Sequence, residues 1–290
     1  MRVVRGEGER QKATAWDVPV TDVNDLPARF PEAKLLPTTV ARVPKLDPSD
    51  SSVAGGVRVW VALESLQVTG SFKVRGALVA LAEARRAHGP DVHVVAASAG
   101  NHAAGVAYAA RVLGVRATVV MPNGAPKAKR ARVLAEGAEI VLVDSPHYDD
   151  AEAHALRLAS ESGRVFVSPY DDPFVAAGNG GSLGFEIANA LGKAPDVVLC
   201  PFGGGGLASG LGWSLRSTHA SAGGSAPEIW GVQSEASPAM ALSLSTGSAV
   251  TRLEAGGETL AEGLEGGISR SGFARARAEV AGVLVVVRAA

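Results

Sequence analysis

The stretch that decides the fold runs from Lys73 to Gly114 and reads KVRGALVALAEARRAHGPDVHVVAASAGNHAAGVAYAARVLG. Its first part, up to His88, is rich in alanine and leucine and has the length of a helix. The short apolar run His93–Ala96 predicts a strand that is buried on both faces. A second alanine-rich segment of helical length follows at Ala103–Leu113. This order of elements predicts an α/β fold.

The same alternation continues in both directions along the chain. Further candidate strands lie at 57–63, 117–121, 139–143, 165–167, 197–200, 229–233 and 283–287. Further candidate helices lie at 126–136, 151–162, 181–191 and 207–219. Apolar strands separated by helices predict parallel sheets that are covered on each face and joined by right-handed crossovers. We expect two open, mostly parallel twisted sheets flanked by helices, with a small domain (73–162) inserted in a larger, discontinuous one (1–72 and 163–290).

The bulk composition is that of a soluble globular protein, with 47% hydrophobic residues, 20% charged residues and a net charge of −1. No basic stripe suggests nucleic acid or an anionic membrane as a partner. No apolar run approaches the roughly 18 residues that span a bilayer, and the first residues lack the apolar centre of a signal peptide. The single cysteine, Cys200, excludes an intramolecular disulfide and a multi-cysteine metal site. We expect a cytoplasmic protein.

The first motif that carries chemistry is Thr69-Gly70-Ser71-Phe72-Lys73-Val74-Arg75-Gly76, which follows a strand and opens a helix. A lysine is electrostatically disfavoured at the positive end of a helix dipole. The apolar Phe72 and the nearby glycines favour burial of Lys73, which lowers the pKa of its amine and frees it to form a Schiff base. A solvated surface lysine is the alternative, and this motif alone does not decide between the two.

The second motif is Ser98-Ala99-Gly100-Asn101-His102, between a predicted strand and a predicted helix. Open α/β sheets bind ligands beyond the carboxyl ends of their strands. The backbone N–H groups of this loop suit an anion such as a carboxylate, and the Asn101 side chain both donates and accepts hydrogen bonds. Helix capping by Ser98 or Asn101 is the alternative that needs no ligand.

The third motif is Pro201-Phe202-Gly203-Gly204-Gly205-Gly206-Leu207, again between a strand and a helix. Four glycines expose consecutive N–H groups at a helix N-terminus, which favours a phosphate site. The motif is neither a dinucleotide fingerprint nor a P-loop. A flexible hinge is the alternative.

Together the three motifs indicate an imine-forming lysine, a loop for a carboxylate and a phosphate site, which are the groups that recognise pyridoxal 5′-phosphate bound to an amino acid. In these motifs the chain resembles the tryptophan synthase β-like family of pyridoxal-phosphate enzymes, also called fold type II. Within that family it is most similar to the serine/threonine dehydratase (threonine ammonia-lyase) branch. The resemblance runs from about Leu36 to Val287.

The resemblance implies roles for individual residues. Lys73 binds the cofactor as a Schiff base and later moves the α-proton, Phe72 lies beside it, and Asn101 hydrogen-bonds the 3′ oxygen of the cofactor. The phosphate is held by Gly203, Gly204, Gly205, Gly206 and Leu207. The substrate carboxylate is received by Ser98, Ala99, Gly100, Asn101 and His102. Glu262 and Gly263 match an acidic-glycine pair that lies near the cofactor in relatives.

The reaction that the resemblance implies is an α,β-elimination. A β-hydroxy amino acid such as L-threonine or L-serine loses its α-proton and its hydroxyl, and the product hydrolyses to a 2-oxo acid and ammonia. The substrate is a small amino acid, and the family tends to form homodimers.

Three departures from the family pattern refine these expectations. Serine racemases of this branch carry a second serine as the acid where this chain has Ala99, so elimination is favoured over racemisation. Members with a structural divalent metal place acidic residues where this chain has Gln233 and Ala239, and Glu235 is out of register, so we expect no metal. Relatives usually continue beyond the position that matches Val287, where a serine, threonine or cysteine contacts the pyridine nitrogen. We therefore expect part of the family fold to be missing and turnover by these 290 residues to be slow or absent.

Two other functions stay open at this point. One is β-replacement of the cysteine synthase type, although those enzymes carry threonines in the loop where this chain has Ser98 and His102. The other is a truncated, inactive homologue that binds pyridoxal phosphate weakly or not at all.

Overall fold

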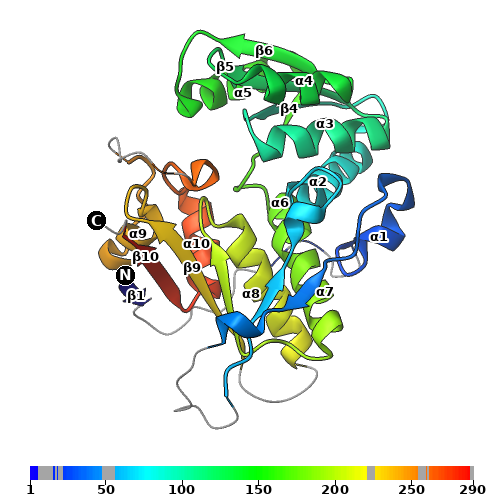
Figure 1. Cartoon of the computed structure of the whole chain (residues 1–290). Helices are drawn as coiled ribbons and strands as arrows, with labels where there is room; N and C mark the ends of the chain where they lie inside the picture. Colours follow the sequence, from blue (N-terminus) through cyan, green and yellow to red (C-terminus); the bar gives the residue numbers. More distant parts are fainter. Residues whose placement is uncertain are drawn as a thin grey trace.

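The computed structural model describes residues 1–5, 16, 18, 22–47, 56–220, 226–253, 259 and 261–287. Two four-stranded sheets lie in separate parts of the molecule, with helices packed around and between them (Figure 1). The predicted fold class, α/β with two mostly parallel sheets flanked by helices, is confirmed.

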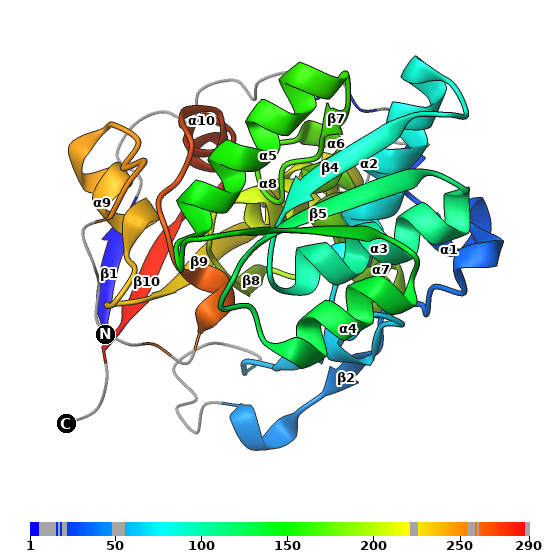
Figure 2. The same ribbon diagram turned by 90° about the horizontal axis from the view of Figure 1, so that it is seen from above.

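The first sheet has the strand order β6-β5-β4-β7, and each neighbouring pair is parallel. Its strands are β4 (His93–Ala97), β5 (Arg116–Pro122), β6 (Glu139–Val143) and β7 (Val165–Phe166). The helices around it are α2 (Lys73–His88), α3 (Asn101–Leu113), α4 (Lys127–Ala135) and α5 (Tyr148–Ser162). Seen from above in Figure 2, α3 and α4 lie on one side of this sheet and α5 lies on the other. Helices therefore cover both faces of the sheet, although its edge strand β6 stays partly exposed.

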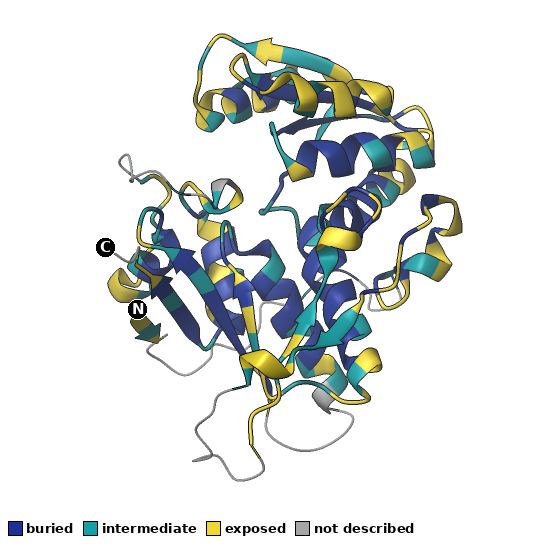
Figure 3. Ribbon diagram, viewed as in Figure 1, coloured by how far each residue is buried: buried dark blue, intermediate teal, exposed yellow. Residues whose placement is uncertain are grey.

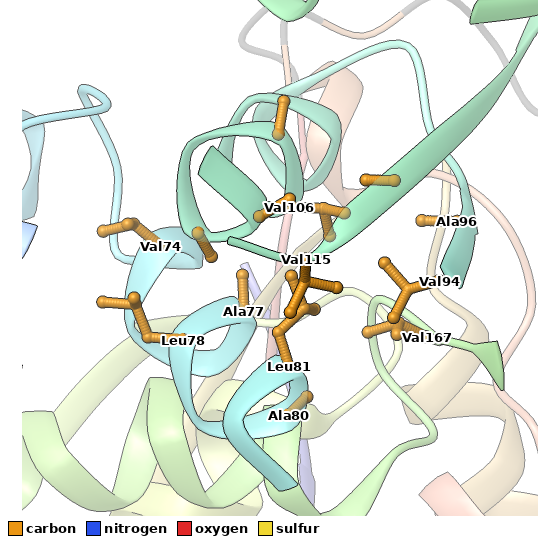
Figure 4. Close-up of a cluster of buried hydrophobic side chains, with 14 of the residues drawn as sticks. Val74, Ala77, Leu78, Ala80, Leu81, Val94, Ala96, Val106, Val115 and Val167 are labelled. Atoms are coloured by element: carbon orange, nitrogen blue, oxygen red, sulfur yellow. The ribbon is translucent and has the colours of Figure 1, made fainter. Parts of the chain in front are cut away.

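Alternate residues of β4 point to the two faces, as the pleat of a strand requires. Val94 and Ala96 join the core that α2 and α3 build, whereas Val95 and Ala97 pack with α5. Figure 4 shows the first core, in which side chains of α2 such as Leu81 approach the sheet. Each large aliphatic side chain buried here stabilises the fold by roughly 1.5–3 kcal/mol. This layer fixes α2, which begins at the lysine of the first motif.

The second sheet has the order β1-β10-β9-β8. Its strands β8 (Val197–Pro201), β9 (Glu228–Ser234) and β10 (Gly282–Val286) are parallel, and β1 (Arg2–Arg5) pairs antiparallel with β10. The helices that contribute to its core are α7 (Ser182–Leu191), α8 (Gly206–Ala220), α9 (Ala239–Thr246) and α10 (Arg270–Glu279). Figure 3 shows α8 buried along most of its length, in the middle of the molecule.

The remaining elements are short. β2 (Val40–Arg42) and β3 (Trp60–Ala62) form a separate antiparallel pair. The others are α1 (Leu26–Arg29), α6 (Pro173–Ala176), the 3-10 turns η2 (Pro31–Ala33), η3 (Pro44–Leu46), η4 (Glu64–Leu66) and η6 (Glu262–Leu264), and the π-helical turn η5 (Ala177–Gly181). The strand predicted at 57–63 is thus only three residues long, and it belongs to neither four-stranded sheet.

All other predicted strands and helices are present, with ends that differ by three residues or fewer. The sequence did not predict β1, β2, α1, α6, α9 and α10. β1 reads Arg-Val-Val-Arg and is mostly exposed, so it lacks the apolar run that marks the buried strands. α10 carries Gly272 and alternating arginines and alanines, a pattern without a clear apolar stripe.

The predicted boundary at residue 162 divides a small domain from a larger one. β7 begins beyond this boundary, yet it pairs with β4 in the first sheet. The first sheet therefore draws one strand from the segment assigned to the larger domain, and the division itself stays a prediction. Within the described part of the chain, no helix has both the length and the apolar character that crossing a bilayer requires.

Candidate functional site

Lys73 is the first residue of α2 and directly follows its N-cap, Phe72. Its Nζ donates to the carbonyl oxygen of Pro169 at 3.0 Å and lies 5.3 Å from the centre of the Phe72 ring. Among the described residues, no carboxylate pairs with it. Part of the side chain reaches solvent, but the surrounding atoms desolvate the amine and lower its pKa to about 8. An appreciable fraction of this amine is neutral near pH 7, and the neutral form is the nucleophile.

The second motif forms the turn between β4 and α3. Gly100 is the N-cap of α3 and no side chain caps the helix, so the capping alternative is not realised. The Ser98 hydroxyl instead accepts from the Gly100 N–H at 3.1 Å. The Ala104 N–H donates to the Gly100 carbonyl, so the N–H groups of residues 101–103 precede the helix's own hydrogen bonds. Asn101 is exposed, and this helix N-terminus can receive an anion.

His102 has a narrower role than the sequence suggests. Its side chain is buried, and Nε2 lies 3.1 Å from the carbonyl oxygen of Val167, which can only accept, so Nε2 carries the proton. Burial and, second, the charge of Lys73 lower the pKa of His102 to about 3, so the ring is neutral. Nδ1 is then an acceptor, and it has no partner among the described residues. The ring therefore has no N–H to offer a carboxylate, and only the backbone N–H of His102 can bind one.

The four glycines of the third motif link β8 to the N-terminus of α8. Gly205 has a φ of +92°, in the left-handed region that favours glycine, and it marks the turn into the helix. The Ser209 N–H donates to the Gly205 carbonyl at 3.0 Å, so the N–H groups of residues 206–208 precede the bonds of α8. A helix N-terminus that follows a run of glycines, which carry no side chains of their own, suits a phosphate.

Gly204 has a further reason to be glycine. A Cβ at this position would lie 2.5 Å from Cγ of Tyr170, so the tyrosine packs directly on the loop. At Gly203 the nearest atom to such a Cβ is the carbonyl oxygen of Gly263, at 3.2 Å. This places Gly263, which the resemblance puts near the cofactor, beside the glycine loop.

Residues 167–172, here called the linker segment, connect β7 to α6 and gather the predicted groups. The carbonyl of Val167 accepts from His102, and that of Pro169 accepts from Lys73. Tyr170 packs on Gly204. Lys73, the second motif and the glycine loop, which are far apart in the sequence, therefore meet at one segment.

Tyr170 lies at the candidate site, although the sequence analysis did not identify it as a functional residue. Its hydroxyl donates to Oε1 of Glu152 in α5 at 2.8 Å, and the hydroxyl of Tyr148 donates to the same oxygen at 3.1 Å. Burial raises the pKa of both phenols, and the Glu152 charge raises it further, so both stay protonated and donate. Tyr170 thus joins the glycine loop to the helix on the far face of the first sheet.

The linker segment is also held from α10. Nη2 of Arg275 donates to the carbonyl oxygen of Asp171 at 2.7 Å and pairs with its carboxylate at 3.0 Å. The Ser271 hydroxyl donates to the same carboxylate. The signal available in the sequence was the run Ser168-Pro169-Tyr170-Asp171-Asp172-Pro173, which follows a strand as the other loops do.

Arg75, two residues after Lys73, is fully buried in an ionic cluster. It pairs with Glu64 at 2.7 Å and with Glu186 at 2.7 Å, and its Nη2 donates to the Thr38 hydroxyl at 2.9 Å. Burial opposes its charge, but the hydrogen bonds that Arg75 donates to Glu186 and Glu64, together with their negative charges, outweigh burial and raise the pKa of Arg75. The cluster ties the first turn of α2 to α7 and to the segment that precedes β2.

Other singled-out residues have structural roles. Gln233 is buried, donates to the Phe202 carbonyl at 3.2 Å and accepts from the Ala241 N–H at 3.0 Å. Burial raises the pKa of the Cys200 thiol to about 12, which makes it a poor nucleophile. In the part of the chain that the structure describes, no three His, Cys, Asp or Glu side chains gather as a metal site requires.

Known proteins similar to this chain belong to the family that the three motifs resemble. Residues 35–289 match a family described as pyridoxal-phosphate dependent enzymes. An L-threonine ammonia-lyase of Thermotoga maritima is 44% identical over 221 residues, which cover 74% of this chain and 50% of that protein. The chain spans about half the length of the curated relatives that it matches first.

Solved structures are similar over nearly the whole chain. A threonine deaminase isoform 2 from Solanum lycopersicum has a TM-score of 0.79 and 31% identity, covering 99% of this chain and 76% of that one. A serine racemase from maize has a TM-score of 0.76 and 25% identity, covering 92% of this chain and 76% of that one. Deaminases and racemases thus share this arrangement of elements.

Proposed function

Since this chain belongs to the family of pyridoxal-phosphate-dependent enzymes, we propose that it is an ammonia-lyase acting on a β-hydroxy amino acid such as L-threonine or L-serine. The products are a 2-oxo acid and ammonia. The observation that carries the proposal is the amine of Lys73, which is desolvated and has no carboxylate partner among the described residues. The linker segment joins this amine to the two loops that we propose to bind anions. The fold type II resemblance inferred from the motifs is confirmed by the family match.

The residues present fit the cofactor. The lowered pKa of Lys73 gives an amine that can attack an aldehyde near neutral pH. The glycine loop presents the N-terminus of α8 to a phosphate, and the left-handed Gly205 lets the chain turn into that helix. Bound pyridoxal phosphate supplies an electron sink for the charge that develops at the substrate's α-carbon.

Each protein group has a defined task in this proposal. Lys73 holds the cofactor and, once released from it, takes the α-proton of the substrate on its own face. The N–H groups at the start of α3 receive the substrate carboxylate and orient the α-carbon. Asn101 hydrogen-bonds the ring oxygen, with Phe72 beside the amine; Gly203, Gly204, Gly205, Gly206 and Leu207 hold the phosphate.

Racemisation is the second reaction to consider, because a serine racemase from maize has a similar structure. It requires a proton to be returned on the face opposite Lys73. By the family resemblance, Ala99 stands where racemases of this branch carry a serine, and a methyl group can return no proton. Ala99 therefore favours elimination.

The test has two stages. The visible spectrum of the purified protein after addition of pyridoxal phosphate should show the band of lysine-bound cofactor, which a protein that does not bind it would lack. Incubation with a panel of amino acids should then release a 2-oxo acid from L-threonine or L-serine. Chiral chromatography after incubation with L-serine decides the reaction type, since accumulation of D-serine faster than pyruvate would exclude the lyase. Release of a β-substituted product from O-acetylserine and sulfide would favour β-replacement.

The proposal includes a cytoplasmic homodimer. It is supported by the composition and by the habit of the family, and light scattering should give about twice the 29.4 kDa of one chain.

A further inference from the structure

The segment that follows the linker is one continuous helix with a π-helical turn in its middle. α6, η5 and α7 succeed one another from Pro173 to Leu191 without a break. A π turn accommodates one residue more than an α-helical turn, and such turns are frequent at functional sites. Here the turn Ala177–Gly181 is wholly buried and lies between α2 and α8.

Asn179, in the π turn, reaches the start of the helix that carries Lys73. Its side chain is 1% exposed, and its Oδ1 accepts from the N–H of Gly76 at 2.9 Å. In an α-helix the N–H of the fourth residue ordinarily donates to the carbonyl of the N-cap. Gly76 is the fourth residue of α2, after the N-cap Phe72. The Phe72 carbonyl accepts from the Arg75 N–H at 3.1 Å, and the Gly76 N–H donates to Asn179 in another helix.

The fit between the two helices depends on glycine on both sides. A Cβ on Gly76 would lie 2.4 Å from the carbonyl oxygen of Val175 and 2.6 Å from Oδ1 of Asn179. A Cβ on Gly178 would lie 2.7 Å from Cα of Gly76. The backbones are therefore in direct contact, and the hydrogen bond exists because both positions lack side chains.

The same continuous helix also holds the neighbouring residue of α2. Glu186 pairs with Arg75 at 2.7 Å, and the Ser182 hydroxyl lies 3.4 Å from Arg75 Nη1. The linker segment, which leads into this helix, accepts from the amine of Lys73 through Pro169. Residues 169–186 thus accept hydrogen bonds both from the amine of Lys73 and from the backbone N–H of Gly76.

We propose that Asn179 is a positioning residue for Lys73, because its amide fixes the first turn of α2 and so aims the amine at the site. This inference rests on the proposed role of Lys73 as the lysine that binds the cofactor. Asn179 touches neither substrate nor cofactor and acts only through the backbone of α2.

The decisive variant is Asn179→Ala, which removes the side-chain acceptor of the buried Gly76 N–H and frees the first turn of α2 from the π turn. The dissociation constant of pyridoxal phosphate, from titration of the visible band, should rise on the order of tenfold or more. In the cofactor-free protein, competitive labelling of Lys73 with an amine reagent should give a pKa that moves from about 8 toward the ordinary value, because a loosened first turn admits water to the amine. Asn179→Asp keeps an oxygen of the same reach and should restore cofactor affinity to within about threefold of the native protein.

Ser214→Ala is the matched control. Ser214 is equally buried, and among the described residues its hydroxyl bonds only to carbonyls of its own helix, α8. It should leave the labelling of Lys73 and the cofactor affinity unchanged. If Asn179→Ala unfolds, Asn179→Ser, whose hydroxyl is too short to reach Gly76, serves in its place.

The proposal is overturned if Asn179→Ala lowers the melting temperature but matches Ser214→Ala in cofactor affinity and in Lys73 labelling. That outcome would make Asn179 a purely structural residue. Failure of the proposed function looks different, because the native protein itself would then show no visible band, while the labelling of Lys73 could still be measured.

Discussion

Lys73 and Arg75 lie two residues apart at the start of α2, and the structure surrounds them in opposite ways. Arg75 is fully buried between Glu64 and Glu186, and its pKa is raised. Lys73 meets a carbonyl and an aromatic ring but no carboxylate among the described residues, and burial lowers its pKa to about 8. Two cations on one turn of helix thus differ in the charge that surrounds them.

The difference separates a structural cation from a reactive one. A guanidinium with two carboxylates stays charged and holds three segments of chain together. An amine that the protein desolvates without pairing loses its proton readily and becomes a nucleophile. The four predictions below test this distinction, in order of decreasing effect.

Lys73→Ala should abolish the visible band of lysine-bound cofactor and all release of 2-oxo acid, because one amine provides both the covalent link and the proton transfer. The fold should persist, which circular dichroism can check. Borohydride reduction followed by peptide mapping is the critical measurement. An adduct trapped on another lysine in this variant would show that Lys73 is the wrong residue.

Arg75→Leu should destabilise the protein by about 3–5 kcal/mol in urea unfolding at pH 7, because it leaves the largely but not fully buried carboxylates of Glu64 and Glu186 without a cation. The folded fraction should still show the visible band, since the amine of Lys73 contacts Pro169 and not Arg75. Adding Glu64→Gln and Glu186→Gln should recover part of the loss. Loss of the visible band from folded Arg75→Leu protein would show that Arg75 also takes part in cofactor binding and is not a purely structural cation.

The contrast also explains what sequence patterns can and cannot reveal. The positions of Lys73 and of the glycine run Gly203–Gly206 at the start of a helix were predictable, because local sequence pattern carries that information, and their roles stay predictions. The apolar alternation likewise predicted both sheets, except for β1, whose pairing with β10 joins the two ends of the chain.

The partners of these residues were not predictable, because they come from distant parts of the chain. Asn179 and Gly76 are 103 residues apart, and a lone asparagine in a glycine-rich helix carries no signal of that contact. Tyr170 stands beside Gly204 only once both sheets are packed. The neutral ring of His102 depends in the same way on the carbonyl of Val167.

Lys73→Met should make the cofactor-free protein more stable at pH 7, because it removes the cost of burying a charged amine. The folded pKa of about 8 lies below the ordinary value of 10.5. Between these values the unfolded chain binds more protons, so the native protein gains stability as pH rises through this window. The advantage of Lys73→Met should therefore shrink by about 1.3 kcal/mol between pH 7 and pH 9, and by less where solvent reaches the amine. Arg75 stays charged throughout and adds no such slope, so an advantage constant with pH would mean that Lys73 is not desolvated.

Tyr170→Phe should have the smallest effect, and it tests how far the surroundings of Lys73 extend. The variant keeps the ring on Gly204 but removes the hydrogen bond to Glu152, at a cost of about 1 kcal/mol in thermal or urea unfolding. Tyr148→Phe is the matched control, because it removes the other phenol from the same carboxylate, in a residue of α5 rather than of the linker segment. Both variants should lose similar stability.

Only Tyr170→Phe should weaken cofactor binding, by a few-fold in a titration of the visible band, because Tyr170 follows the carbonyl that holds Lys73 and lies on the glycine loop. Equal cofactor affinities in the two variants would show that Tyr170 does not influence cofactor binding at Lys73, whose relevant neighbours would then be Pro169 and Phe72. Tyr170 would in that case serve only to join α5 to the rest of the fold.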